Sequence, residues 1–303
     1  MQRYSDESGR YRDESGNVAL IVAFALVVLM GMLALVADLG DVYLARERDL
    51  NALDAGALAG VAQIFAGTAA VTQAAQQYVA QNGGTVDRIV VNPSANTVDL
   101  YSTQTVSLHF AEVFGQSSAT FTVHSQAEAG TLVAGDGFAP LAVVRQPFVF
   151  GQTYQLTTGP GEGSDGNYGL LQLGAPGAAQ LEQNLLYGYS GTLSVGGQVP
   201  TETGIAAGAV RDALGQRLQE GSACTFATAT ENCPRVLLLP VINALPEDGK
   251  KLVAIVGFAA FYLDSLGEAE GHTAVSGQFM KMIVPGTLGA GENFGLYTVR
   301  LSQ

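Results

Sequence analysis

An uninterrupted apolar run lies near the start of the chain, at residues 18–37. It has twenty residues, no charge and no proline, and acidic residues flank it at Asp13, Glu14 and Asp38. As a helix rising about 1.5 Å per residue, the run spans about 30 Å, the thickness of a bilayer's hydrocarbon core. A cleaved signal peptide is the alternative, but its apolar core would be shorter and would lead into a small-x-small cleavage site. The pattern therefore predicts a retained transmembrane helix.

The segments on either side of this run predict its orientation. Residues 1–17 are polar, and residues 4–9 recur almost unchanged as 11–16, so we expect a disordered cytoplasmic tail. In the segments that adjoin the run, more arginines precede it than follow it, which favours a cytoplasmic N-terminus: Arg3, Arg10 and Arg12 come before it, and Arg46 and Arg48 after it. We therefore expect a single-pass protein whose larger part lies outside the cytoplasm.

Beyond the run, the spacing of apolar positions predicts a compact unit at residues 38–135. Residues 38–81 are rich in alanine and keep a helical spacing up to Asn82, which predicts a continuing helix with a break near Gly67. From Asp87 the apolar positions alternate, as in strands. A long helix laid across a small antiparallel sheet resembles the plan of pilin-like proteins. The elements expected after the helix are strands at 88–92 and 97–101, a helical turn at 110–115 and a strand at 119–129.

A second, β-rich domain is predicted for residues 136–303. Strands at 236–242 and 252–262 are apolar on both faces, so we expect them to be central and covered. A helix at 208–219 carries Val210, Leu214 and Leu218 on one stripe. The fold class predicted for the whole chain is α+β. Further strands are expected at 141–144, 153–156, 168–173, 277–283 and 297–301.

Composition and charge exclude a nucleic-acid binder. The 303-residue chain has 14 basic and 27 acidic side chains, a net charge of −13, and no basic cluster longer than Lys250 and Lys251. Such a chain repels a phosphate backbone. The 38 glycines follow no Gly-X-Y period, which excludes collagen and favours a structure rich in loops or strands.

Cys224 and Cys233 are the only cysteines of the sequence, with eight residues between them in a polar loop. An isolated pair that closes a short loop predicts a disulfide formed in an oxidising compartment. Two free thiols are the alternative. A disulfide here agrees with an extracytoplasmic position for this part of the chain.

No metal or cofactor site is predicted. His109, His124 and His272 lack metal-ligand spacing, and we expect the first two to be surface or cross-strand residues. Residues 161–166 match the bare GxGxxG pattern, but a predicted strand follows them where a nucleotide site needs a helix N-terminus. The oxygen-bearing residues of this loop do not follow the pattern of an EF-hand: Glu162, Asp165 and Asn167.

No catalytic residue is predicted either, and we expect a non-enzymatic protein. The sequence has no Gly-x-Ser-x-Gly elbow. The polar composition of residues 264–273 predicts a solvated loop between strands. The one constellation that a hydrolase could use lies in or beside this loop: Asp264, Ser265, His272 and Ser276.

A processing signal overlaps the tail. Glu14 stands fifth after Gly9, as in the Gly-x-x-x-x-Glu motif of type IV prepilins, and cleavage there would leave Arg10 as the new N-terminus. Three residues separate Glu14 from the apolar run, and the duplicated tail offers another origin for the match. An acidic residue at a membrane interface also needs no special explanation.

Three N-terminal segments, residues 14–19, 36–43 and 50–60, resemble in order and spacing the N-terminal region of TadG-like proteins of the Tad (tight adherence, Flp pilus) assembly system. The resemblance covers about residues 13–65. It implies a bitopic protein of the bacterial cell membrane that works with TadE-like pseudopilins and pilus assembly platform proteins, facing the periplasm or the cell exterior. Many TadG proteins end in a von Willebrand factor A domain, whose Asp-x-Ser-x-Ser metal motif is absent here.

These observations define the functional hypotheses. The first is a membrane-anchored, non-enzymatic component of Tad/Flp pilus assembly, whose β-rich domain makes protein contacts outside the cytoplasm. The second is a surface-exposed, pseudopilin-like filament subunit or adhesive binding module, in which the pilin-like half forms a homo-oligomer. The third is an anchored hydrolase. Apart from the lipid bilayer, the expected partners are proteins.

Overall fold

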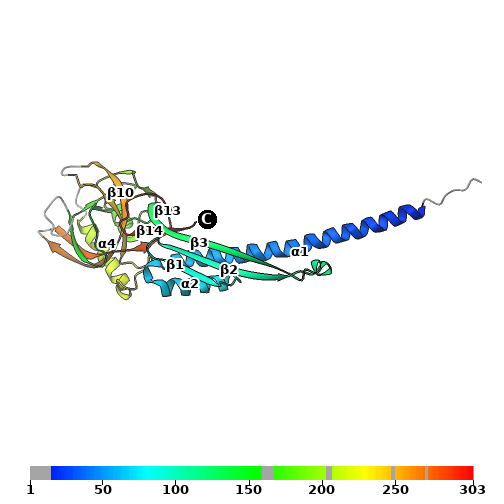
Figure 1. The fold of residues 1–303 in the computed structure, drawn as a ribbon. Helices are drawn as coiled ribbons and strands as arrows, with labels where there is room; N and C mark the ends of the chain where they lie inside the picture. Colours follow the sequence, from blue (N-terminus) through cyan, green and yellow to red (C-terminus); the bar gives the residue numbers. More distant parts are fainter. Residues whose placement is uncertain (1–14, 159–166, 203–206, 247–249, 270–271, 303) are drawn as a thin grey trace, which may run out of the picture.

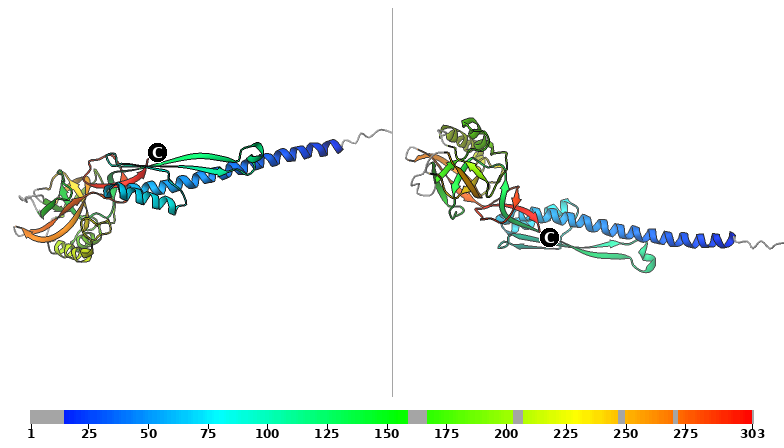
Figure 2. Two further views of the ribbon diagram at one scale, coloured as in Figure 1. Left: turned by 60° about the horizontal axis from the view of Figure 1, so that its bottom comes forward. Right: turned by 90° about the horizontal axis from the view of Figure 1, so that it is seen from above.

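The computed structural model describes residues 15–158, 167–202, 207–246, 250–269 and 272–302. A long helix, α1 (Ser15–Val61), extends from a body that contains two sheets (Figures 1 and 2). A helix of 47 residues is about 70 Å long at 1.5 Å per residue. The apolar run lies in its free end, and its C-terminal part lies against the body. The predicted α+β class is confirmed.

A sharp turn after α1 returns the chain along the helix. A short 3-10 helix, η1 (Ile64–Ala66), leads into α2 (Thr68–Gln81), which runs antiparallel to α1. The break falls at Gly67, as predicted. The backbone φ of Gly67 is 98°, a conformation that residues with a Cβ rarely adopt.

α1 and α2 pack closely because the residues between them are small. A Cβ placed on Gly56 would overlap the side chain of Val79 and lie 3.0 Å from the backbone oxygen of Ala75. A Cβ on Gly60 would lie 3.2 Å from the Cβ of Ala75. The two glycines therefore let the backbones approach. The surrounding α1 residues are fully buried: Ala52, Leu53, Ala57 and Val61.

The first sheet covers the C-terminal part of α1 and has the order β1-β2-β3-β14-β12. β1 (Arg88–Asn92) and β2 (Thr97–Ser107) form the predicted hairpin. β3 (Ser118–Gly135) pairs along the whole of β2 and extends past its predicted end at residue 129. Between β2 and β3 lies η2 (Ala111–Phe114), the predicted helical turn. The remaining strands are β14 (Leu296–Leu301), β12 (Met282–Ile283), and β13 (Thr287–Leu288) and β7 (Leu193–Ser194), which also pair with β3.

The second sheet closes into a ring of strands. Its order is β11-β5-β6-β4-β9-β10, and β10 pairs in turn with β11. β9 is central, and both of its faces are buried, as its apolar sequence predicts. The strands are β4 (Leu141–Val144), β5 (Thr153–Thr158), β6 (Asn167–Leu170), β9 (Val236–Ile242), β10 (Leu252–Ala269) and β11 (His272–Met280), with β8 (Gln198–Pro200) beside β10.

Two helices pack against this ring. α4 (Ala207–Glu220) is the predicted helix, and its Val210 and Leu214 are buried in the core. α3 (Ala178–Tyr187) is not among the predicted elements, although Leu181 and Leu185 stand one turn apart and both are buried. The segment is short and has glycines on either side, so its apolar residues keep a helical spacing over a single turn only, and the sequence gives little indication of a helix.

The prediction of a solvated loop at residues 264–273 is wrong for the residues that the structure describes. β10 continues to Ala269 and β11 begins at His272, with Ser265 opposite Ser276. Ser265 is exposed, whereas the next residue, Leu266, is half-buried. An exposed hairpin arm turns every second side chain towards water, so polar composition alone does not separate it from a loop.

The C-terminal strand returns to the first sheet. β14 pairs antiparallel with β3, with Tyr297 opposite Thr131 and Leu301 opposite Ala127. β12 then pairs with β14 in parallel. Residues after 135 therefore contribute to both sheets, and the division of the chain at residues 17/18, 37/38 and 135/136 stays a prediction.

Replacing Gly56 with leucine should destabilise the protein, because the larger side chain has to displace α2. We expect a loss of about 1–3 kcal/mol in the free energy of unfolding, the usual cost of overpacking. Gly40→Leu is the matched control on the same helix, since no atom lies within 4 Å of a Cβ placed there. Denaturant unfolding of the full chain in detergent measures both variants. Equal stability of the two would contradict the close packing of α1 on α2.

Candidate functional site

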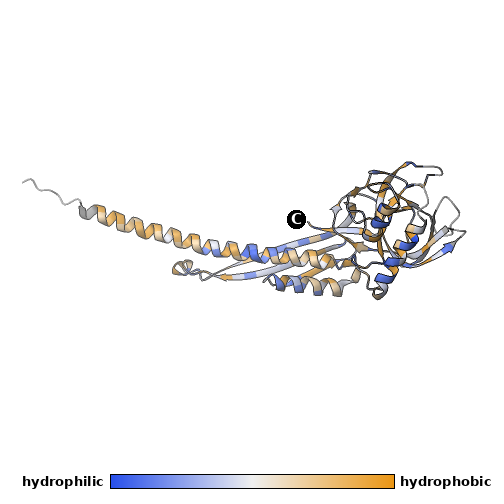
Figure 3. Cartoon of the chain, turned by 180° about the vertical axis from the view of Figure 1, so that it is seen from behind, coloured by the Kyte–Doolittle hydropathy of each residue, from blue (hydrophilic) through white to orange (hydrophobic). Residues whose placement is uncertain are grey.

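The N-terminal part of α1 presents a continuous apolar surface. Figure 3 shows it as the apolar end of the helix, free of the body. From Val18 to Val36 its large apolar side chains are exposed, and none of the residues in its most apolar window is buried. This helix is long and apolar enough to cross a membrane. Asp38 follows immediately and marks the polar end of the run.

Asp38 fastens the tip of the β2–β3 hairpin to α1. The residue is only 3% exposed. Its Oδ1 accepts a hydrogen bond from the backbone N–H of His109 at 2.9 Å, and its Oδ2 accepts from those of Phe110 at 3.0 Å and Ala111 at 2.6 Å. Three donors at the start of η2 therefore converge on one carboxylate. Figure 1 shows this tip beside α1, far from the second sheet.

This site stabilises the ionised form of Asp38. Burial by itself raises the pKa of Asp38, but the three N–H donors and the electrostatic effect of His109 together outweigh burial and keep the pKa below its usual value of 3.8. The carboxylate thus stabilises the folded state fully above its ordinary pKa. Its contribution is lost as the pH falls through the lowered pKa.

Two further aspartates join α1 to the first sheet. The Oγ–H of Ser125 on β3 donates to Oδ1 of Asp54 at 2.6 Å. The backbone N–H of Thr85, just before β1, makes a longer contact of 3.4 Å to Oδ1 of Asp49, which is itself buried. α1 is therefore held to the sheet by polar contacts as well as by its apolar core.

The cysteine pair packs at the edge of the apolar core that contains Leu132, Phe138 and Phe258. The structure joins Cys224 and Cys233 in a disulfide, with their Cα atoms 6.3 Å apart. The hydroxyl of Tyr262 on β10 donates to the backbone oxygen of Cys224 at 2.8 Å, and Phe226 packs edge-on against the Tyr262 ring. The disulfide loop is thereby attached to the ring of strands.

Arg217 ties α4 to its surroundings. Its guanidinium donates to the backbone oxygens of Leu185 and Leu186 at the end of α3, and to those of Pro234 and Val236 at the start of β9. Burial lowers the pKa of Arg217 to about 10, and the nearby Glu220 partly opposes this. The side chain is therefore charged at neutral pH. Its N–H groups donate hydrogen bonds to four backbone carbonyl oxygens.

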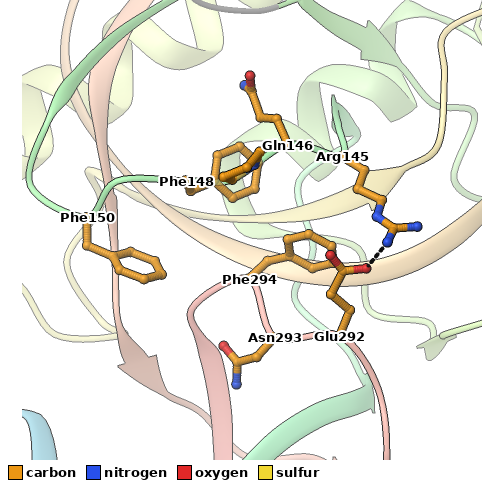
Figure 4. Close-up of a pocket in the computed structure, with 8 residues that line it drawn as sticks. Arg145, Gln146, Phe148, Phe150, Glu292, Asn293 and Phe294 are labelled. Atoms are coloured by element: carbon orange, nitrogen blue, oxygen red, sulfur yellow. Dashed lines mark ion pairs between the residues drawn. The ribbon is translucent and has the colours of Figure 1, made fainter.

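Two hollows are the candidate contact sites of the body. One, of about 510 Å³, is lined by Phe148, Phe150 and Phe294 and bordered by an ion pair between Arg145 and Glu292 at 2.8 Å (Figure 4). The other, of about 730 Å³, lies between the turn around η1, the disulfide loop and β12. Beside the aromatic rings and the ion pair, Gln146 and Asn293 also line the first hollow.

The hydrolase constellation is not assembled. Ser265 faces Ser276 across the β10–β11 pair, but His272 lies four register positions from them, opposite Ala269. At about 3.4 Å per residue, this places the backbones of His272 and Ser276 about 14 Å apart along the strand. The Oδ2 of Asp264 accepts a hydrogen bond from Gln278 at 3.0 Å.

The first two histidines lie on the first sheet or at its tip. His124 on β3 stacks on Tyr101 and its Nε2 lies 3.0 Å from Oδ1 of Asp99, which is a cross-strand arrangement. His109 is exposed, and its backbone bonds to Asp38. The glycine-rich segment 161–166 lies outside the described residues. So do the residues of the prepilin-type signal, Gly9, Arg10 and Glu14.

Comparison with known proteins identifies the N-terminal region. A family model described as "Putative Flp pilus-assembly TadE/G-like" matches residues 16–63. The N-terminal region of this chain is similar to TadE/G-like proteins. No curated protein and no solved structure matches the chain. The match supports a part in Flp pilus assembly, and it covers α1 from the apolar run to the start of the turn at η1.

The TadE/G-like region contains the three aspartates described above. Asp38, Asp49 and Asp54 interrupt a helix that is otherwise apolar or small on its covered face. The sequence places an acidic residue at each position but does not reveal the partner, because His109, Thr85 and Ser125 lie 36 to 71 residues further along the chain. Their pairing depends on how the hairpin folds back on the helix.

Replacing Asp38 with asparagine should release the hairpin tip. An amide offers one acceptor oxygen and directs N–H groups at the backbone donors. We expect faster hydrogen exchange at residues 109–111 in D38N, while D41N, which changes an exposed aspartate one turn away, exchanges as the wild type does. In the wild type, the protection of residues 109–111 against hydrogen exchange, relative to the intrinsic exchange rate, should fall as the pH drops below about 4. Protection of the tip in D38N equal to wild type would contradict the role of Asp38.

Replacing Arg217 with methionine should cost about 2–4 kcal/mol of unfolding free energy, since four backbone oxygens lose their donor. Arg211→Met on the same helix is the control. Arg211 pairs with Glu268, but both side chains are more than half exposed, so its loss should cost less than about 1 kcal/mol. Denaturant unfolding without reductant compares the two. Similar losses in both would show that the carbonyl contacts contribute little.

Proposed function

We propose that this protein is a membrane-anchored, non-enzymatic component of Tad/Flp pilus assembly whose body makes protein contacts outside the cytoplasm. The observation that carries the proposal is the coincidence of two independent features in residues 16–63. The segment matches a TadE/G-like family model, and its first half is a helix whose apolar side chains nothing in the described chain covers. An exposed apolar helix of this length requires a bilayer or other apolar helices around it.

The distribution of charge and the disulfide support the orientation. Three arginines stand close before the apolar run and two stand close after it, which favours an N-terminus in the cytoplasm. The bond between Cys224 and Cys233 suits the oxidising side of the membrane. We therefore place residues 38–303 in the periplasm or outside the cell.

The body is suited to binding proteins. The two hollows described above combine aromatic or aliphatic side chains with polar and charged ones, as protein contact surfaces do. The described residues include no group of three or more His, Cys, Asp or Glu that could hold a metal ion. TadE-like pseudopilins and assembly platform proteins are the partners that the family suggests. Their helices could pack on the apolar run of α1 within the bilayer.

A filament subunit is the alternative, because α1 laid on the first sheet has the plan of a pilin. In that role the chain would be cleaved after Gly9, begin at Arg10, and occur in sheared filaments. A full-length chain that stays in the membrane fraction would exclude this alternative.

Protease treatment tests the proposed topology. In spheroplasts with an intact inner membrane, we expect external protease to digest the body of the protein and to leave an epitope on the N-terminal tail protected. A cytoplasmic marker protein must survive in the same sample. Digestion of residues 136–303 only after the cells are lysed would overturn the proposal. Alkaline extraction of the same membranes checks that the chain is anchored rather than adsorbed.

A further inference from the structure

The tip of the β2–β3 hairpin exposes an apolar cluster that the fold leaves uncovered. Phe110 is 49% exposed, Val113 84% and Phe114 75%. These three residues lie within five positions of each other, in and just before η2. Large apolar side chains gathered in this way on a protruding turn usually meet another surface.

The fold fixes this cluster at one level along α1. Asp38 binds the backbone of residues 109–111 directly, so the tip is held at the first polar residue after the apolar run. Figures 1 and 2 show the hairpin reaching along α1 to this level in every view, away from the second sheet. The tip therefore lies where the helix leaves the hydrocarbon layer, if residues 18–37 span it.

We propose that the hairpin tip is a second membrane contact, in which Phe110, Val113 and Phe114 insert into the interfacial layer of the bilayer beside α1. This inference rests on the anchoring set out under the proposed function. Aromatic and aliphatic side chains at the boundary of headgroups and acyl chains bind by the apolar area they bury. The exposed Tyr43, five residues past Asp38, lies on the same polar side of the run.

The charged groups of the hairpin tip indicate which kind of lipid surface it can contact. The titratable groups of the tip are Glu112 and His109, and both are exposed. A single carboxylate among apolar side chains gives no attraction to anionic lipid, so the contact needs only a zwitterionic bilayer. Two attachments, one a helix and one a hairpin tip, would prevent the body from swinging about the point where α1 leaves the membrane.

A tryptophan probe tests the contact, because the chain contains no tryptophan. Three single-tryptophan variants of the full chain are reconstituted in phosphatidylcholine vesicles with bromine at shallow or deep acyl positions. F114W reports on the tip, L29W on the middle of the apolar run, and Y187W on an exposed residue of α3 in the body. We expect shallow bromine to quench F114W more than deep bromine, deep bromine to quench L29W, and neither to quench Y187W.

The outcomes separate the two proposals. If L29W is quenched but F114W behaves like Y187W, the tip does not touch lipid and this inference fails while the anchoring stands. If L29W is not quenched either, the anchoring fails as well. A blue-shifted F114W that is not quenched and depends on the protein-to-lipid ratio would show that another protein chain covers the tip, which also overturns the inference.

Two further variants keep the test independent of one substitution. V113W replaces the most exposed residue of the cluster and should be quenched as F114W is. Adding D38N to F114W should reduce the quenching, because the tip is no longer held at the membrane level, whereas adding D41N should not. Quenching unchanged by D38N would show that Asp38 does not set the depth of the tip.

Discussion

Helix α1 runs unbroken through two different surroundings: an apolar one around its first half, and the packed interior of the protein along its second half. Its first half carries side chains that no part of the described chain covers, and only hydrocarbon or other apolar helices can do so. Its second half is covered by α2 and by the first sheet, through small residues such as Gly56 and polar contacts such as Asp54 with Ser125. Because the helix does not break between the halves, the position of the membrane fixes the position of the body.

The elements of the first unit could largely be predicted, since they depend on local patterns. The hairpin turn, the break at Gly67 and the helical turn at residues 110–115 each follow from a change of period or a glycine near the right place. The hairpin arm of β10 and β11 could not, because a polar, exposed arm and a solvated loop have the same composition. The return of β14 to β3 has no local signal, since the paired residues stand more than 160 positions apart.

The candidate sites divide in the same way. The cysteine pair was predictable because the sequence contains no other cysteine and the loop is short. Asp38 and Arg217 were not predicted, because the groups they bind are backbone atoms, which every residue type supplies. An acidic residue directly after an apolar run is nevertheless a usable signal, since its burial requires donors from somewhere else in the fold.

β3 leads into the second sheet, and after β11 the chain returns through β12 and β13 to β14, which lies beside β3 in one ladder. The ring of strands is therefore an insertion whose entry and exit share the same end of the first sheet. A pull on that ring would reach both strands at the same end and in the same direction. Such a pull would run along the strands towards α1 and would not peel β3 from β14 one hydrogen bond at a time.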